Sequence, residues 1–88
     1  MGAEDRVQRI ESLLREKLDA TDVQVIDESY QHRGHAGAAG GGGHFRVTVL
    51  SPRFAGLSLV QAQRLVYEAV GAMMDGEIHA LAITTRPS

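Results

Sequence analysis

The sequence contains no cysteine among its 88 residues. A chain without cysteine cannot form a disulfide, cannot use a thiol as a nucleophile and cannot supply a thiolate to a metal. Any metal that this chain binds must therefore be held by its histidines or carboxylates, or by the ligands of a partner molecule.

The sequence also lacks a long apolar run and a surplus of charge of one sign. No apolar stretch approaches the roughly 20 residues of a membrane-spanning helix, and the charged start from Glu4 onward predicts no secretory signal. The formal net charge of −2 disfavours binding to nucleic acid or to a membrane surface, because both require a positively charged protein surface. We therefore expect a cytoplasmic protein without membrane contact, folded as a single domain over residues 1–88.

Two stretches carry apolar residues at helical spacing. The first is residues 4–20. The second follows Ser58, which forms a predicted capping box with Gln61 three residues later, and it is predicted to end at Asp75-Gly76. The predicted apolar face of the first helix is Val7, Ile10, Leu13, Leu14 and Leu18. That of the second is Leu59, Ala62, Leu65, Val66, Ala69, Val70 and Met73.

Three segments show the pattern of a strand, namely "DVQVIDES" from residue 22, "HFRVTVLS" from residue 44 and "EIHALAITT" from residue 77. Between the second strand and the second helix, "SPRFAGLS" predicts a turn or a very short helix. The expected faces of the last strand are Ile78, Ala80 and Ala82 on one side and His79, Leu81 and Ile83 on the other.

These segments together predict an α+β fold, a small two-layer sandwich with the order α-β-β-α(short)-α-β. A three-stranded sheet is expected, with both long helices covering one of its faces. The first two strands can pair as an antiparallel hairpin in spite of the long connection between them.

That connection is the least ordinary part of the sequence. The stretch "SYQHRGHAGAAGGGGHF", residues 29–45, contains three histidines among glycine and alanine, and we expect a flexible loop at about residues 31–43. Long loops within compact domains are either functional or disordered, and we favour a functional one. The residues alone leave several roles open: solvated loop residues or metal ligands for His32 and His35, a polar strand start for His44, and a strand-end residue for His79. A zinc or copper site made from these four histidines is also chemically reasonable.

Four motifs occur together and in a fixed order: "HFRV", "SPRFAG", "RLVYEAV" and "IHALAI". With them the sequence resembles the BolA family along nearly its whole length. The resemblance implies a fold similar to the type II K-homology arrangement. It also implies a heterodimer with a monothiol glutaredoxin that binds a [2Fe-2S] cluster, in iron-sulfur cluster assembly, trafficking or iron and redox sensing. Some family members regulate transcription in the stress response.

The resemblance also implies which residues bind the cluster. The family histidine that opens the last strand corresponds to His79, and a second ligand falls in the loop. Within "GHAG" His35 is the first choice, and His32 and His44 are the alternates. The sulfur ligands would come from the glutaredoxin cysteine and from glutathione, which is consistent with a chain that has no cysteine. No cofactor is expected for the isolated chain, and a weak homodimer is left open.

The alternative hypothesis is a nucleic-acid-binding transcriptional regulator that uses the helix-turn-helix-like region after Arg53. In this reading Arg53 and Arg64 would contact phosphate. The sequence "GAAG" at residues 37–40 has the letters of the K-homology loop, but it lies between strands rather than helices. The family's basic "RHR" is "AQR" here, which leaves only Arg64. No catalytic triad or phosphate loop is present, so we predict no enzymatic activity.

Overall fold

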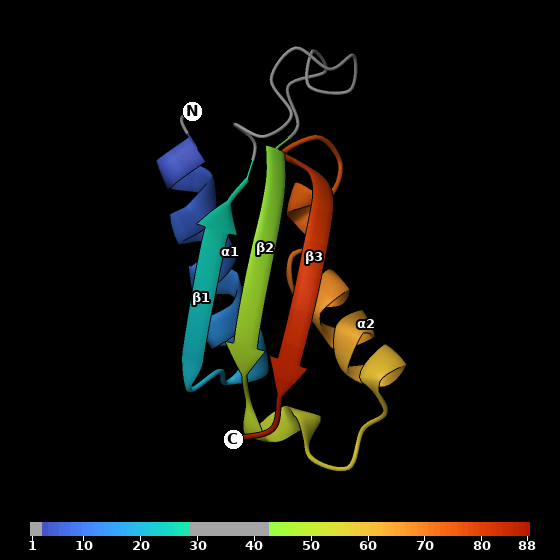
Figure 1. Cartoon of the computed structure of the whole chain (residues 1–88). Coiled ribbons are helices and arrows are strands. Elements are labelled where there is room, and N and C mark those ends of the chain that lie inside the picture. The colour runs from blue at the N-terminus through green and yellow to red at the C-terminus, as the bar shows by residue number, and fades with distance from the viewer. Residues whose placement is uncertain (1–2, 29–42) are drawn as a thin grey trace.

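The computed structural model describes residues 3–28 and 43–88 (Figure 1). Its elements follow the predicted order, with two short 3-10 helices placed around the second long helix, and the predicted fold class is confirmed. The elements are α1 (Ala3–Leu18), β1 (Asp22–Asp27), β2 (Gly43–Leu50), η3 (Pro52–Phe54), α2 (Leu59–Ala69), η4 (Gly71–Met73) and β3 (Ile78–Arg86).

The three strands form one sheet in the order β1-β2-β3. β1 pairs with β2 in the antiparallel sense, whereas β3 lies parallel to β2. The parallel pair requires a crossover, and η3, α2 and η4 provide it. Both long helices lie behind the sheet in Figure 1, so the opposite face of the sheet is open. In the same view β2 and β3 begin at the end of the sheet where β1 finishes.

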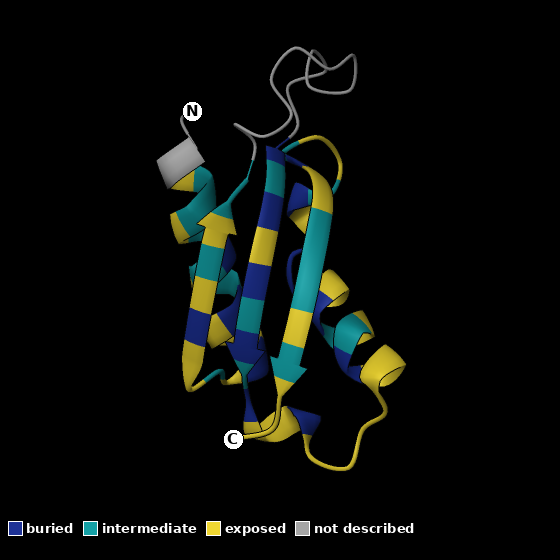
Figure 2. Cartoon of the chain, viewed as in Figure 1, coloured by how far each residue is buried: buried dark blue, intermediate teal, exposed yellow. Residues whose placement is uncertain are grey.

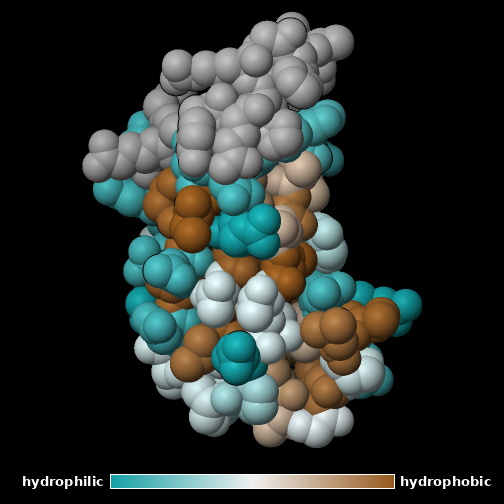
Figure 3. Space-filling view, in the orientation of Figure 1, coloured by the Kyte–Doolittle hydropathy of each residue, from teal (hydrophilic) through white to brown (hydrophobic). Residues whose placement is uncertain are grey.

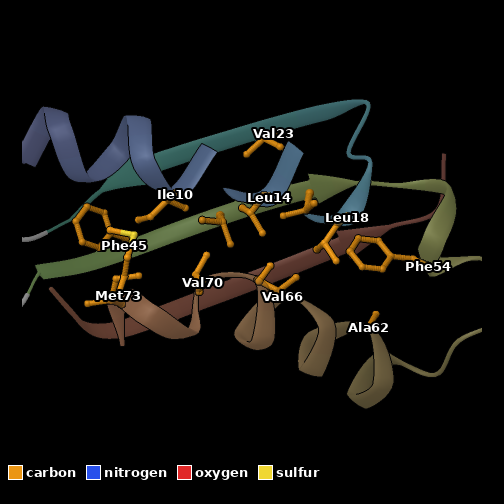
Figure 4. Packing of buried hydrophobic residues seen from close by; sticks show 14 residues of the cluster. Ile10, Leu14, Leu18, Val23, Phe45, Phe54, Ala62, Val66, Val70 and Met73 are labelled. Carbon is orange, nitrogen blue, oxygen red and sulfur yellow. The ribbon is translucent and has the colours of Figure 1, made fainter. Parts of the chain in front are cut away.

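The hydrophobic core fills the space between the sheet and the two helices. Along β2, buried residues alternate with more exposed ones, because successive side chains of a strand point to opposite faces (Figure 2). The inward residues of this strand meet apolar residues from α1, α2 and η4 (Figure 4). Full burial of one such side chain contributes about 1.5–3 kcal/mol. The fully buried members of the core include Ile10, Leu14, Val47, Val49, Val66, Val70 and Met73.

β3 contains one extra residue near its start. Gly43 of β2 pairs with Ile78, but the next residue, His44, pairs with Ala80, so the register shifts at this point. His79 is the residue inserted between these two pairs. An inserted residue of this kind is a β-bulge, and such irregularities redirect side chains.

The inserted residue reverses the faces expected at the start of β3. Ile78 is only 1% exposed and belongs to the core, against which Leu81 and Ile83 also pack. His79 is exposed. The prediction that placed His79 with Leu81 and Ile83, and Ile78 on the other face, is therefore wrong. Simple alternation does not allow for an extra residue.

The second helix begins as predicted but ends earlier, and one residue of its predicted apolar face is exposed. Its capping box is confirmed, because the Ser58 side chain accepts from the Gln61 backbone N–H and the Gln61 side chain accepts from that of Ser58. The helix ends at Ala69 rather than near residue 75, since Gly71 is a poor helix former and the chain tightens into η4. Leu59, predicted to be part of the apolar face, is 62% exposed. It lies in the first turn, which projects past the sheet (Figure 1), where apolar side chains reach the surface (Figure 3).

Candidate functional site

His44 and His79 lie side by side at the end of the sheet where β2 and β3 begin. Their ring centroids are 5.1 Å apart, and the ring planes are inclined by 46°. Each histidine is the second residue of its strand. Parallel strands that begin together bring their first residues together, and this accounts for two histidines that are far apart in the sequence becoming neighbours.

The backbone around both histidines is fixed by hydrogen bonds. The Gly43 N–H donates to the Glu77 carbonyl at 3.1 Å, and the Glu28 N–H donates to the His44 carbonyl at 2.7 Å. These bonds tie the start of β2 to both of its neighbours. An ion pair between Arg9 of α1 and Glu77 holds the chain just before β3. The positions of the two rings thus rest on a supported backbone.

The His79 side chain is open to solvent, whereas His44 is half-buried. A His79 imidazole enclosed in the core could not have reached a metal held by another molecule, so exposure is a requirement that the proposed ligand meets. Farther along β2, the Arg46 guanidinium forms an ion pair with the Glu28 carboxylate at 3.3 Å. What this edge of the sheet offers chemically is a pair of imidazole nitrogen donors.

The loop histidines His32 and His35 lie outside the described residues. The residues on either side of their segment are described: Glu28 directly follows β1, and Gly43 is the first residue of β2. Both points lie at the same end of the sheet as His44 and His79 (Figure 1). Over residues 3–28 and 43–88, no group of three or more histidine or carboxylate side chains could hold a metal ion.

The two arginines of the nucleic-acid hypothesis lie elsewhere. Arg53 is in η3, at the opposite end of the sheet from the histidines (Figure 1), and Arg64 is on the exposed surface of α2. The Arg53 Nη1 donates to the carbonyl of Lys17 at 3.2 Å, near the end of α1. Arg53 therefore joins the turn to the first helix. Nucleic-acid binding by these residues stays a prediction.

Sequence reasoning ranked His44 last among the loop candidates and did not pair it with His79. The contact depends on the register of β2 against β3 and on the inserted residue, neither of which alternation of apolar residues specifies. The signal available in the sequence was only that both histidines come at the start of predicted strands. The ion pair of Arg9 with Glu77 gave no sequence signal, because its partners are 68 residues apart.

The described part of the chain contains no helix that is long and apolar enough to cross a membrane.

The model of the family "BolA-like protein" matches residues 14–88. This match covers the sheet, the second helix and both histidines described above. The chain therefore belongs to the BolA-like family.

Individual relatives support the same assignment. The chain is 37% identical over 86 residues to "Protein BOLA1, chloroplastic" of Arabidopsis thaliana, covering 94% of this chain and 54% of that protein. It is 42% identical over 78 residues to BolA-like protein 1 of Mus musculus, covering 88% of this chain and 57% of that protein. The chain thus spans a little over half the length of these two relatives.

Among solved structures, the BolA domain of SufE1 from Arabidopsis thaliana superposes with a TM-score of 0.81 at 35% identity. The superposition covers 99% of this chain and 94% of the solved one. The present fold is therefore that of a BolA domain over essentially its whole length.

Proposed function

We propose that this protein is an adaptor that forms a heterodimer with a monothiol glutaredoxin and shares a [2Fe-2S] cluster with it. In this proposal His79 and one loop histidine, His35, are the ligands, with His32 and His44 as the alternates. The role is in iron-sulfur cluster assembly and trafficking or in iron and redox sensing, and the chain itself is not a catalyst. The observation that carries the proposal is the exposed position of His79 at the end of the sheet from which the histidine-containing segment departs.

The donor set of the chain fits a shared cluster. Imidazole nitrogens serve as ligands to one iron of a [2Fe-2S] cluster, and they raise its reduction potential relative to ligation by thiolates alone. The chain has four histidines and no cysteine, so it can provide nitrogen but not thiolate sulfur. The sulfur ligands must then come from the glutaredoxin cysteine and from glutathione, and a partner becomes a chemical requirement. The name of one relative, SufE1, gives indirect support for an iron-sulfur setting.

The protein itself would do three things at this site. The bulge exposes His79, the bonded backbone at Gly43 and Glu28 holds the strand ends in place, and the attached segment brings a second imidazole. Fixing a residue of a glycine-rich stretch on binding costs on the order of 1–2 kcal/mol. Such a cost keeps the affinity moderate, which suits a cluster that is passed on or sensed.

The test is to mix the chain with glutathione and a monothiol glutaredoxin that carries the cluster, and to record visible absorption and circular dichroism. We expect the spectrum of the glutaredoxin homodimer to be replaced by a different one as the chain is added. His79→Ala should alter the new spectrum or make the cluster labile. Thr84→Ala is the matched control, since Thr84 is an exposed residue farther along the same strand.

Substitutions in the loop then identify the second ligand. His35→Ala should change the spectrum. If only His32→Ala or only His44→Ala changes it, that residue is the second ligand instead of His35. A spectrum that stays that of the glutaredoxin homodimer at excess chain would refute the proposed heterodimer. We keep the cytoplasm as the proposed compartment, and because an Arabidopsis relative is named chloroplastic, fractionation of cells is its direct check.

A further inference from the structure

β3 lies at one edge of the sheet, and its outer side has no partner strand among the described residues. The strand order is β1-β2-β3, so β3 pairs only with β2. The N–H and C=O groups of alternate residues in a strand point to the same side of it. The Arg86 carbonyl accepts from the N–H of Ser51, the residue directly after β2. The backbone groups of Leu81, Ile83 and Thr85 therefore point away from β2, toward the outer side, here named the β3 edge.

The β3 edge lacks the usual protection of an exposed strand. Proteins protect such edges with charged side chains, with proline or with a covering element, because an open edge can pair with another chain. Residues 80–85 of β3 contain neither a charge nor a proline. The other edge strand, β1, is shorter and has an aspartate at each end, Asp22 and Asp27. Of the two edges, that of β3 is thus the one suited to accept a further strand.

α2 does not fully cover the core next to this edge. On β2 the inward residues Val47 and Val49 are fully buried. Leu81 and Ile83 of β3 also pack against the core, yet they are only half-buried. Figure 1 shows α2 behind β3, with its first turn standing away from the strand. The outer margin of the core is therefore left open to a partner.

The face of α2 next to the β3 edge carries exposed apolar side chains. Among the described residues five large apolar side chains are exposed, and three of them are on α2: Leu59 (62%), Val60 (57%) and Tyr67 (42%). Tyr67 follows the other two by eight and seven residues, which places all three on one face of the helix. The Tyr67 hydroxyl lies 3.5 Å from the Leu81 carbonyl, so this face adjoins the β3 edge.

We propose that the β3 edge and this face of α2 bind an extended segment of a partner protein, which adds to the sheet as a fourth strand. The backbone of the segment pairs with the backbone groups of the edge, and its apolar side chains pack on α2. Unpaired backbone groups give such binding its affinity, and side-chain contacts give its specificity. The inference uses no histidine and does not rest on the proposed function.

Two arginines specify the charge of the partner segment. Arg86 is the last residue of β3, and Arg64 is on the same face of α2 as Val60 and Tyr67. Neither arginine forms an ion pair with another described residue, not even Arg64 with Glu68 one turn later. Carboxylates complement unpaired guanidinium groups. The segment is therefore apolar in its middle and acidic at its ends.

A peptide fits this surface better than a strand of nucleic acid does. Proteins that bind single strands stack the bases on several aromatic side chains within a positively charged groove. This surface has one aromatic side chain, Tyr67, and two arginines. A K-homology domain also needs a GXXG loop between its helices, whereas residues 55–58, between η3 and α2, contain one glycine, Gly56.

The first measurement is amide hydrogen exchange of the free chain. The N–H groups of Leu81, Ile83 and Thr85 should exchange more than about tenfold faster than those of Ala82 and Thr84, which face β2. Equal protection of both sets would show that the β3 edge is already paired, and would overturn the inference.

The second measurement is an NMR titration of the full chain with a synthetic peptide. The peptide is as long as β3, nine residues, and alternates valine and threonine between a glutamate at each end. We expect the three amides of the β3 edge to shift in the ¹H–¹⁵N spectrum and to become protected from exchange. The same peptide with every backbone nitrogen methylated should not bind. With lysine in place of both glutamates it should bind at least about threefold more weakly.

Variants of the chain test the two parts of the surface. Thr85→Pro removes one outward N–H, which an edge strand tolerates, and Leu59→Ser removes an exposed apolar side chain. Each should weaken binding of the peptide about tenfold. Thr84→Ala is the matched control on β3, because the backbone of Thr84 faces β2, and it should leave the affinity unchanged.

The inference is overturned if the peptide does not protect the three amides, or if the methylated peptide binds equally well. Protection that rises with chain concentration in the absence of peptide would assign the edge to a second copy of the chain, which also overturns it. Binding of single-stranded oligo(dT) at these amides, without binding of the peptide, would assign the surface to nucleic acid instead. No glutaredoxin or cluster takes part, so this failure would be separate from failure of the proposed heterodimer.

Discussion

Polar side chains at the two ends of the sheet differ in burial and in hydrogen bonding. At the end where β2 finishes, Ser51 is fully buried and bonded through its side chain and its backbone. Its hydroxyl donates to the Leu18 carbonyl and accepts from the Arg53 N–H, and its N–H donates to the Arg86 carbonyl at 3.1 Å. At the end where β2 begins, the His79 imidazole faces solvent beside His44.

This difference distinguishes polar groups that stabilise the fold from polar groups that can bind a ligand. A buried polar group that is fully bonded within the chain stabilises the fold and offers nothing to a ligand. The Ser51 hydroxyl links the end of α1 to η3, so its hydrogen bonds stabilise the fold. An exposed imidazole held on a supported backbone contributes little to the fold, yet it can bind a metal that arrives from outside. Measurements of stability after substitution at each end test this division.

The largest effect on stability is expected for Ser51→Ala. Removal of the hydroxyl leaves the Leu18 carbonyl and the Arg53 N–H without their partner, and an unsatisfied buried group costs about 1–3 kcal/mol. We expect the free energy of unfolding in urea to fall by about 2 kcal/mol. If the free energy of unfolding falls no more than it does on substitution of an exposed serine, the buried hydroxyl of Ser51 does not stabilise this end of the sheet.

Ser58→Ala is the matched comparison and has a smaller expected effect. Ser58 is an exposed cap whose hydroxyl accepts from the Gln61 N–H at 3.2 Å. Loss of such a cap costs about 1 kcal/mol, because water can replace part of the bond. The same urea titration and the loss of helical circular dichroism on heating check this value. An equal loss for both serines would remove the contrast between a buried and an exposed hydroxyl.

The smallest effect is expected for His79→Gln. The side chain is exposed, and substitutions at surface positions outside special features usually change stability by less than about 0.5 kcal/mol. In metal-free buffer the urea midpoint should therefore match that of the wild type. A fall as large as that of Ser51→Ala would mean that His79 serves the fold rather than a ligand.

The sequence predicted those parts of the fold that depend on local pattern. Helical spacing in α1, alternation in β2 and the Ser58–Gln61 capping box are encoded within a few neighbouring residues, and each is confirmed. The end of α2 was misplaced, because a glycine within an apolar pattern does not by itself reveal that the helix will tighten into a 3-10 turn.

The candidate site was predictable only in part. His79 was identified by its resemblance to a family position, and its exposure agrees with a role as a ligand. The contact with His44 was not predicted, because it arises from the parallel register and one inserted residue. The proposed ligand His35 and its alternate His32 lie outside the described residues, so their part in the site stays a prediction.

The most direct test of the central claim is pulsed electron paramagnetic resonance of the reduced cluster in the heterodimer. The chain is labelled with ¹⁵N-histidine, and the glutaredoxin and glutathione carry no label. We predict a strong ¹⁵N coupling to the cluster that is lost or halved in His79→Ala and unchanged in Thr84→Ala. A cluster that shows no ¹⁵N coupling in the intact heterodimer would contradict the account, because no imidazole of this chain would then bind its iron.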